Sequence, residues 1–157
     1  MALEFSPPVQ EECRKIIAKY PRSRSAVLPL LYVAQREFGY VSKDAEELVA
    51  RLLELPPADV AGVVSFYTMF YREPVGKYVV QVCRTISCAL MGGDDLAGHL
   101  KQKLGIEFGE TTPDGRFTLK NVECLASCGT APVAQINDDY HENLTIEKLD
   151  RILDALP

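Results

Sequence analysis

The spacing of the cysteines is the feature of this sequence that points most directly to chemistry. Cys83 and Cys88 form one close pair and Cys124 and Cys128 form a second, while Cys13 stands alone. Two close cysteine pairs separated by a structured stretch are typical of a metal site with four thiolate ligands. We therefore take the four paired cysteines as candidate ligands and expect Cys13 to be a small residue of an apolar core.

The spacing alone is compatible with more than one kind of four-thiolate site. A 2Fe-2S cluster and a structural zinc ion both bind four cysteine thiolates, but zinc ribbons more often use C-x-x-C pairs. The C-x4-C and C-x3-C pairs in this chain favour iron-sulfur without excluding zinc. A thiol-disulfide oxidoreductase would need a C-x-x-C active site, which the sequence does not contain. Four buried cysteines without a ligand role are the least favoured interpretation, because these cysteines are paired.

Small residues accompany both cysteine pairs. Ser87, Gly92 and Gly93 lie within or after the first pair, and Ser127 and Gly129 lie beside the last cysteine. Residues of this kind let backbone N–H groups approach a buried anion. A 2Fe-2S cluster with four thiolates is a dianion when oxidised and a trianion when reduced, and burying such charge without hydrogen bonds is costly. The small residues therefore support an anionic cluster.

Composition and charge exclude several classes of protein. The chain has 157 residues, 47% apolar and 25% charged, so it can bury a core and is not a disordered tail. Its 17 basic and 22 acidic side chains give a net charge of -5, which argues against a nucleic-acid partner. The first residues lack a signal-peptide pattern, and no apolar run approaches the ~18 residues that span a bilayer. We expect a cytoplasmic protein without direct membrane insertion, in which reduced cysteines serve as ligands.

The first seventy or so residues have the apolar spacing of amphipathic helices, interrupted by proline and glycine. Ser25 and Ser42 are expected to cap two of these helices, and Pro21 and Gly39 are expected to end two of them. The apolar stripes predict the core of a helical bundle. The expected helices cover residues 7–20, 25–38, 42–55 and 58–70.

The pattern changes after residues 73–76, where proline and glycine coincide with a new hydrophobic period. From there, β-branched runs predict strands, and two stretches with helical spacing predict helices, the last capped by Thr145. We therefore predict an α+β protein, with an N-terminal helical bundle over residues 1–73 and an α/β domain over residues 74–157. The expected strands cover residues 78–82, 117–119 and 132–136 and the neighbourhood of Tyr140, and the expected helices cover residues 94–104 and 146–153.

These predicted strands would bring the two cysteine pairs together. Cys83 and Cys124 follow strand ends, so their thiolates can emerge at the same edge of one sheet. Cys88 and Cys128 are expected in the loops that follow. The two pairs would then form a single site.

The other motifs assign no further cofactor to this chain. Neither His99 nor His141 is paired with a cysteine, as a Rieske centre would require. The sequence contains no phosphate loop, no G-x-G-x-x-G and no convincing Ser-His-Asp order. Any hydride chemistry with NADH or a flavin is therefore expected on another chain.

A resemblance to a known family is carried by residues 39–42 (GYVS), 62–70 (GVVSFYTMF), 83–88 (CRTISC), 123–128 (ECLASC) with 131–133 (APV), and 143–145 (NLT). These stretches resemble the E subunit of respiratory complex I, which is the thioredoxin-like 2Fe-2S ferredoxin of NADH:quinone oxidoreductase. The similarity covers essentially the whole chain from Tyr20 to the final helix. Both halves match in order, which is more specific than the cysteines alone.

The resemblance implies a fold, a cofactor and a ligand set. A helical N-terminal domain would precede a thioredoxin-like domain, whose loops hold one 2Fe-2S cluster through Cys83, Cys88, Cys124 and Cys128. One departure is Ala126, because the family usually has glycine at this place. Its methyl group restricts φ and could shift the hydrogen bonds of the loop, and with them the reduction potential, without threatening ligation.

The resemblance also implies a partner. In such assemblies the E subunit packs on the F subunit, which holds FMN, the NADH site and a further cluster, among other peripheral-arm subunits. The cluster would exchange single electrons with the FMN. The whole assembly would be an oxidoreductase and translocase, and through it this chain would lie peripherally on the cytoplasmic side of the inner membrane. Residues 62–70 are compatible with a docking surface and with a buried fourth helix.

Two other functions stay open at this point. One is the homologous 2Fe-2S subunit of an NAD-linked formate dehydrogenase or hydrogenase. The other is a zinc-stabilised four-cysteine interaction module without redox activity.

Overall fold

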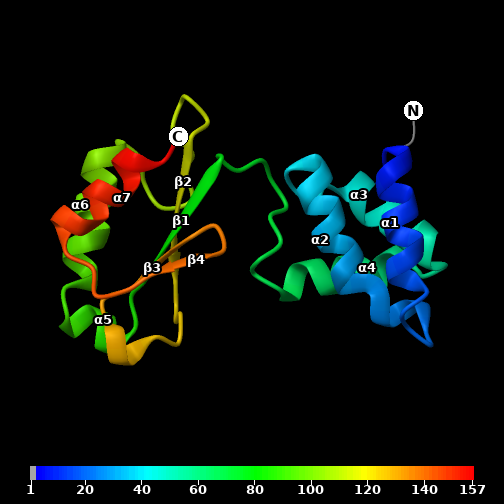
Figure 1. The fold of residues 1–157 in the computed structure, drawn as a ribbon, viewed down its shortest axis with the longest axis horizontal. Coiled ribbons are helices and arrows are strands. Elements are labelled where there is room, and N and C mark those ends of the chain that lie inside the picture. The colour runs from blue at the N-terminus through cyan, green and yellow to red at the C-terminus, as the bar shows by residue number, and fades with distance from the viewer. Residues whose placement is uncertain (1–2) are drawn as a thin grey trace. The chain divides into compact units, whose positions relative to one another are not determined.

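A computed structural model describes residues 3–157 of the chain (Figure 1). The chain divides into two compact units, of which the first ends at Pro74 and the second comprises Val75–Pro157. Helices build the first unit, and a sheet with helices builds the second. The predicted α+β class is therefore confirmed.

The first unit is built from short amphipathic helices whose ends follow local sequence signals. Pro7 and Pro8 occupy the first turn of the first helix, where no backbone N–H is needed. The Ser42 hydroxyl caps the third helix by accepting a hydrogen bond of 3.2 Å from the backbone N–H of Ala45. Gly39 ends the second helix with a φ of 82°. The helices are α1 (Pro7–Ile17), η1 (Ser23–Ala26, a 3-10 turn), α2 (Val27–Phe38), α3 (Lys43–Leu53) and α4 (Pro57–Phe66).

Four expected helix ends in this unit were wrong. Helix α3 ends at Leu53 and not at residue 55, because Glu54 has a left-handed backbone with φ 54°. Helix α1 ends at Ile17 because the next residues tighten into turns, in which Tyr20 N–H donates to the Ile17 carbonyl at 3.1 Å. Ser25 does not cap α2, since it lies in the 3-10 turn η1. Helix α4 ends at Phe66, because Tyr67 has an extended backbone with φ -93° and ψ 112°.

The core of the first unit confirms the predicted helical bundle. Cys13 is 1% exposed and packs in this core, as its solitary place on an apolar helix face predicts. Burial raises the pKa of its thiol, so Cys13 is held as an inert neutral group. The fully buried large side chains of this core are Leu30, Leu31, Val41, Leu48, Val49, Leu53, Val60 and Val64.

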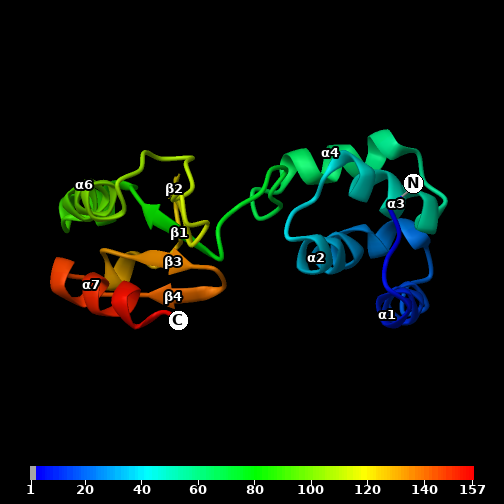
Figure 2. The same ribbon diagram turned by 90° about the horizontal axis from the view of Figure 1, so that it is seen from above.

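The second unit is a four-stranded mixed sheet with two helices on one of its sides (Figures 1 and 2). The strands lie in the order β2-β1-β3-β4; β1 pairs with β2 in parallel and with β3 in antiparallel orientation, and β3 pairs with β4 in antiparallel orientation. Apolar side chains of α6 and α7 pack on β1, β2 and β3 to form the core. The elements are β1 (Tyr78–Cys83), α5 (Ile86–Leu90), α6 (Gly93–Leu104), β2 (Phe117–Val122), η2 (Cys128–Thr130), β3 (Ala134–Ile136), β4 (Asp139–His141) and α7 (Ile146–Ala155).

This order matches the predicted order of strands and helices, with α5 and the 3-10 turn η2 as additions. Strand β3 begins at Ala134, not at residue 132 as expected. Thr145 caps α7 by accepting a hydrogen bond from Lys148 N–H at 3.2 Å, and Gly105 ends α6 with a φ of 66°. Helix α5 was not predicted, because five residues are too few to show a helical period. Among residues 3–157, no helix is long and apolar enough to cross a membrane.

One buried carboxylate in the first unit lacks a hydrogen-bond partner. Glu46 is only 6% exposed, and its Oε1 atom makes no hydrogen bond within the described part of the chain. The nearest cation is Arg72, whose Nε lies 3.8 Å from that oxygen. Burial raises the pKa of Glu46, and the charges of Arg72 and Lys43 offset the rise only in part.

The raised pKa makes Glu46 a source of pH-dependent instability. The folded state favours the protonated acid, so the contribution of Glu46 to stability is greatest below its unfolded pKa and is lost as pH rises through the folded pKa. The substitution Glu46→Gln removes the buried charge and is expected to raise the free energy of unfolding at neutral pH by ~1 kcal/mol. It should also flatten the decline in stability between mildly acidic and neutral pH.

Urea denaturation followed by circular dichroism over this pH range measures both effects. The exposed neighbour Glu47 supplies the control, because Glu47→Gln removes the same charge from the surface of the same helix. A Glu46→Gln protein less stable than the parent at neutral pH would contradict the destabilising role of the buried charge.

Candidate metal centre

The parallel pairing of β1 and β2 places the two cysteine pairs at one edge of the sheet. Cys83 is the last residue of β1 and lies opposite Val122, the last residue of β2. Cys124 therefore follows at the same edge, as predicted. Cys128 begins the 3-10 turn η2, whereas Cys88 lies in helix α5 and not in the predicted loop. Figure 1 shows α5 and η2 at the same end of the second unit.

Cys83 and Cys88 form the buried part of the site. Each is 3% exposed, and both pack with Leu125, Ala131 and Val133. This small apolar cluster is separate from the main core between the sheet and its helices. It shields the two sulfur atoms from water.

Hydrogen bonds make Cys83 the more acidic thiol of this pair. Burial acts to raise its pKa, but hydrogen bonds with the backbone N–H groups of Thr85 and Leu125 and with the side chains of Thr85 and Cys88 outweigh burial and lower it. The Thr85 hydroxyl oxygen lies 3.7 Å from the Cys83 sulfur. A thiolate is therefore stabilised at this position, which is the form that binds a metal.

Cys88 has the opposite tendency. Burial is the main cause that raises the pKa of its thiol, and its hydrogen bond with Cys83 and the nearby charges of Cys83 and Cys128 add to the rise. Deprotonating several of these cysteines without a nearby cation is unfavourable, because the charges would be buried and close to one another. A bound metal would remove this penalty, because its positive charge stabilises the deprotonated ligands.

Cys124 and Cys128 are exposed on the neighbouring connection. The backbone N–H of Ala126 donates a hydrogen bond of 3.2 Å to the Cys124 sulfur. Ala126 has a φ of 57°, in the left-handed region that glycine adopts without strain. The alanine thus occupies a conformation that glycine adopts more easily, and its N–H keeps the hydrogen bond to sulfur.

The four sulfur atoms are not gathered into a closed cage. Among the described residues, no three His, Cys, Asp or Glu side chains are grouped closely enough to hold a metal ion as they stand. Cys83 and Cys88 are in contact, Cys128 lies within electrostatic range of Cys88, and Cys124 has its own N–H donor. The donor set itself, soft thiolates with backbone N–H groups directed at two of them, fits an iron-sulfur cluster.

Gly93 shows how closely the chain packs behind the buried pair. It is the first residue of α6, and a Cβ atom built on it would lie 2.8 Å from the Cys88 carbonyl oxygen and 3.1 Å from that of Cys83. Both neighbours are backbone atoms, which cannot rotate away as a flexible side chain can. The start of α6 therefore fixes the positions of two candidate ligands at once.

The two histidines lie on different elements. His99 Nε2 is 2.8 Å from an oxygen of Asp150, so it joins α6 to α7 within the helical layer. Lys103 on α6 also pairs with Asp150, at 3.1 Å, and with Asp154, at 2.9 Å. His141 lies in β4. This ion-pair group connects the two helices and belongs to the packing of the unit.

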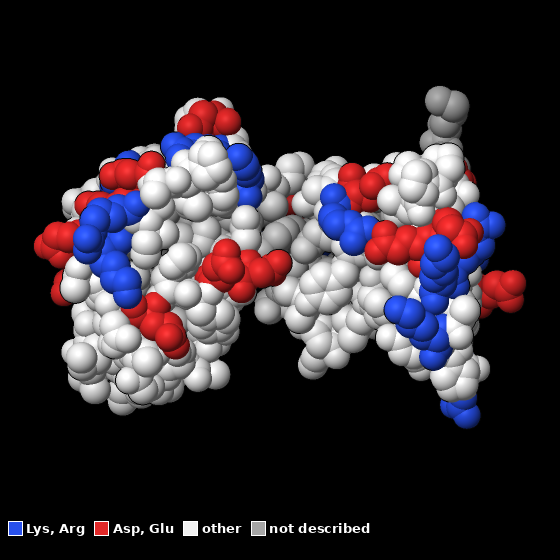
Figure 3. All heavy atoms as spheres, viewed as in Figure 1, with Lys and Arg blue, Asp and Glu red and all other residues white. Residues whose placement is uncertain are grey.

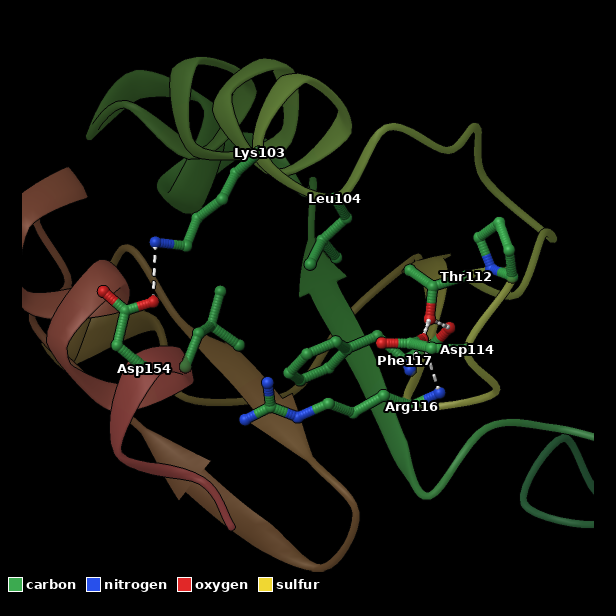
Figure 4. Close-up of a pocket in the computed structure, with 9 residues that line it drawn as sticks. Lys103, Leu104, Thr112, Asp114, Arg116, Phe117 and Asp154 are labelled. Carbon is green, nitrogen blue, oxygen red and sulfur yellow. Dashed lines mark hydrogen bonds and ion pairs between the residues drawn. The ribbon is translucent and has the colours of Figure 1, made fainter.

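A pocket of about 430 Å³ lies at the other end of the sheet, where β2 begins (Figure 4). Phe117, Leu104 and Leu153 form its apolar wall. Its two cations already have partners, since Lys103 pairs with Asp154 and Arg116 donates to the Leu156 carbonyl. The pocket is therefore not part of the cysteine site.

Comparison with known proteins decides the family. The profile of the thioredoxin-like 2Fe-2S ferredoxins matches residues 13–157. The chain belongs to this family. It is 45% identical over 147 residues to the NADH-quinone oxidoreductase E subunit 2 of Rhizobium meliloti (strain 1021), covering 94% of this chain and 88% of that protein. It is 51% identical over 144 residues to the corresponding E subunit of Rickettsia bellii (strain RML369-C), covering 90% of this chain and 86% of that protein.

The fold of this ferredoxin also recurs within a larger enzyme. An NAD⁺-reducing NiFe-hydrogenase in the air-oxidised state superposes with a TM-score of 0.69 at 24% identity over 80% of this chain. This chain spans about a fifth of that hydrogenase chain, with 22% covered. The likeness shows a shared fold, and the family match confirms the predicted thioredoxin-like domain.

Sequence reasoning missed part of the environment of the cysteines. The backbone N–H groups of Thr85 and Leu125 help to lower the pKa of Cys83, and their only signal in the sequence is that each lies next to or near a cysteine. Gly93 was noted as a small residue beside the first pair, but its contact with the backbone of both cysteines depends on the start of a helix that follows.

The close contact at Gly93 generates a prediction for the ferredoxin. The substitution Gly93→Ala is expected to displace α6 from the Cys83 and Cys88 carbonyls, to lower the free energy of unfolding by ~1–3 kcal/mol and to reduce bound iron. Gly98 lies in the same helix, and a Cβ built there meets nothing within 4 Å. Gly98→Ala is therefore expected to stabilise the chain by ~0.5–1 kcal/mol with unchanged iron.

Urea denaturation and the iron content of anaerobically purified protein measure both variants. Equal iron and equal stability in the two variants would show that the contact behind the cysteines has no role.

Proposed function

We propose that this chain is the electron-transfer subunit of an NADH:quinone oxidoreductase, and that it holds one 2Fe-2S cluster. The observation that carries the proposal is the match to the ferredoxin family together with two cysteine pairs at one edge of the sheet. The identity of 45% and 51% to proteins named as the E subunit of NADH-quinone oxidoreductase, over most of both chains, supports the assembly.

The proposed ligands are Cys83, Cys88, Cys124 and Cys128. A 2Fe-2S cluster supplies one-electron redox chemistry when it is bound. In this chain the cysteine thiolates bind it, and the N–H donors to the sulfur atoms of Cys83 and Cys124 stabilise its negative charge. Leu125, Ala131 and Val133 exclude water from the buried side. The proposed role of this chain is that of an electron carrier.

The proposed partner is the F subunit, which would bind both FMN and NADH. The end of the second unit that carries the cysteines has an exposed apolar surface, formed by Ile86, Leu90 and Met91, which are 72%, 79% and 61% exposed. Figure 3 shows mostly uncharged atoms at this end of the unit. Such a surface beside a redox centre suits a protein partner that brings its own cofactor close.

The proposed domain organisation separates the helices of the first part of the chain from the sheet of the second. Residues 1–73 would form the N-terminal helical domain, and residues 74–157 would form the domain that carries the cluster. Within residues 62–70, Phe66 is 77% exposed and Met69 is 41% exposed, which favours contact of this segment with other peripheral-arm subunits. In such an assembly the chain would lie on the cytoplasmic side of the inner membrane.

The ligand proposal predicts the behaviour of five cysteine variants. Serine in place of any one of Cys83, Cys88, Cys124 or Cys128 is expected to abolish or alter the visible spectrum and to lower the iron and sulfide content, because hydroxyl binds iron less well than thiolate. Cys13→Ser is the matched control and should leave the spectrum intact, since Cys13 lies in the core of the first unit. Loss of the cluster in the Cys13 variant alone would overturn the ligand set.

The partner proposal predicts a dependence on a second subunit. NADH is expected to leave the isolated chain oxidised, and to reduce its cluster once the FMN- and NADH-binding subunit is added. Electron paramagnetic resonance of anaerobic samples with and without that subunit measures the reduction. Direct reduction of the isolated chain by NADH would show that the hydride site lies here and would contradict the proposal.

A further inference from the structure

A cluster of three polar side chains holds the segment that carries Cys128. Ser127 and Thr130 flank this cysteine, and both hydroxyls lie against one oxygen of Glu142, which follows β4. The Thr130 hydroxyl donates to Glu142 Oε1 at 2.7 Å, and the Ser127 hydroxyl donates to the same atom. Glu142 is thus tied to the cysteine segment from a place 12 residues beyond Thr130.

The two hydroxyl donors favour a charged Glu142. The Ser127 and Thr130 hydroxyls both donate to one oxygen of its carboxylate, and hydrogen bonds to an ionised acceptor are stronger than those to a neutral one. The two hydroxyl oxygens lie 2.7 Å apart. The Ser127 hydroxyl is the main cause, and the Thr130 hydroxyl the second, of a pKa of Glu142 below its ordinary value. Glu142 is therefore an anion at neutral pH.

Backbone hydrogen bonds hold the same two segments without the help of the carboxylate. Asn143 N–H donates to the Thr130 carbonyl at 2.7 Å, and Leu144 N–H donates to the Pro132 carbonyl at 3.0 Å. The chain can therefore lose the Glu142 charge and keep the pairing of these segments. What the side chain adds is an anion held against Ser127 and Thr130, one residue before and two residues after Cys128, and a restraint on both.

We propose that Glu142 positions Cys128 and that its negative charge lowers the reduction potential of the cluster. The proposal rests on the proposed function, because it concerns the cluster bound through Cys128. Reduction adds one electron from an external donor to the cluster and no proton to Glu142, so the reduced state carries one more negative charge. A fixed anion nearby disfavours that state. Because Glu142 is exposed, dissolved salt screens the effect.

The first test separates charge from position. Glu142→Gln keeps an acceptor oxygen for the two hydroxyls but removes the charge, so the midpoint potential is expected to shift to a more positive value. The shift should shrink as salt is added, and the electron paramagnetic resonance line shape should stay unchanged. Asp138→Asn is the control, because it also removes one negative charge, but in the turn between β3 and β4. That turn lies near the start of β1, where the Asn137 side chain accepts a hydrogen bond from Val79 N–H. It should leave the potential unchanged.

The second test concerns position. Glu142→Ala removes the acceptor as well as the charge, and it is expected to alter the line shape or lower the iron content. In the chain without iron, hydrogen exchange of residues 126–131 should be faster in Glu142→Ala than in Glu142→Gln. The proposal would be overturned if Glu142→Gln and Asp138→Asn had equal midpoint potentials. It would also be overturned if Glu142→Ala matched the parent in line shape, iron content and hydrogen exchange. A parent protein without a 2Fe-2S signal would instead overturn the proposed function, and the role of Glu142 toward the cluster with it.

Discussion

The site depends on the parallel register of β1 and β2. This pairing runs from Tyr78 opposite Phe117 to Cys83 opposite Val122, and it makes the two strands end at the same level. A slip by one residue would turn the Cys83 side chain to the other face of the sheet. The other end of the pairing is tightly constrained, because a Cβ on Gly76 would lie 2.8 Å from the Phe117 backbone and Gly76 N–H donates to the Thr118 hydroxyl at 2.6 Å.

The cysteine site has a buried half and an exposed half, and the two halves have different physical roles. The sulfur atoms of Cys83 and Cys88 lie in an apolar cluster, where thiolates are stable only with hydrogen bonds or a metal. Cys124 and Cys128 are exposed, at the end of the unit where α5 carries exposed apolar residues (Figure 1). A cluster held between them would be shielded on one side and accessible to a partner on the other. That asymmetry suits transfer of single electrons between proteins.

The sequence predicted the elements that have strong local signals and missed those that depend on distant contacts. Ser42 and Thr145 cap their helices as their spacing predicted, and the β-branched run before Cys83 is β1. Helix α5 was missed because it is one short helical segment, so Cys88 was placed in a loop. Glu142 gave no signal, since its hydrogen-bond partners lie 12 and 15 residues away and meet it only in the folded chain.

The central claim is that four thiolates from two connections of one sheet edge hold a single 2Fe-2S cluster. Iron, sulfide and zinc analysis of the anaerobically purified full chain, combined with electron paramagnetic resonance after reduction by dithionite, tests it most directly. We predict two irons and two sulfides per chain and a signal from one unpaired electron. A colourless protein with one zinc per chain, no sulfide and no signal would contradict the claim.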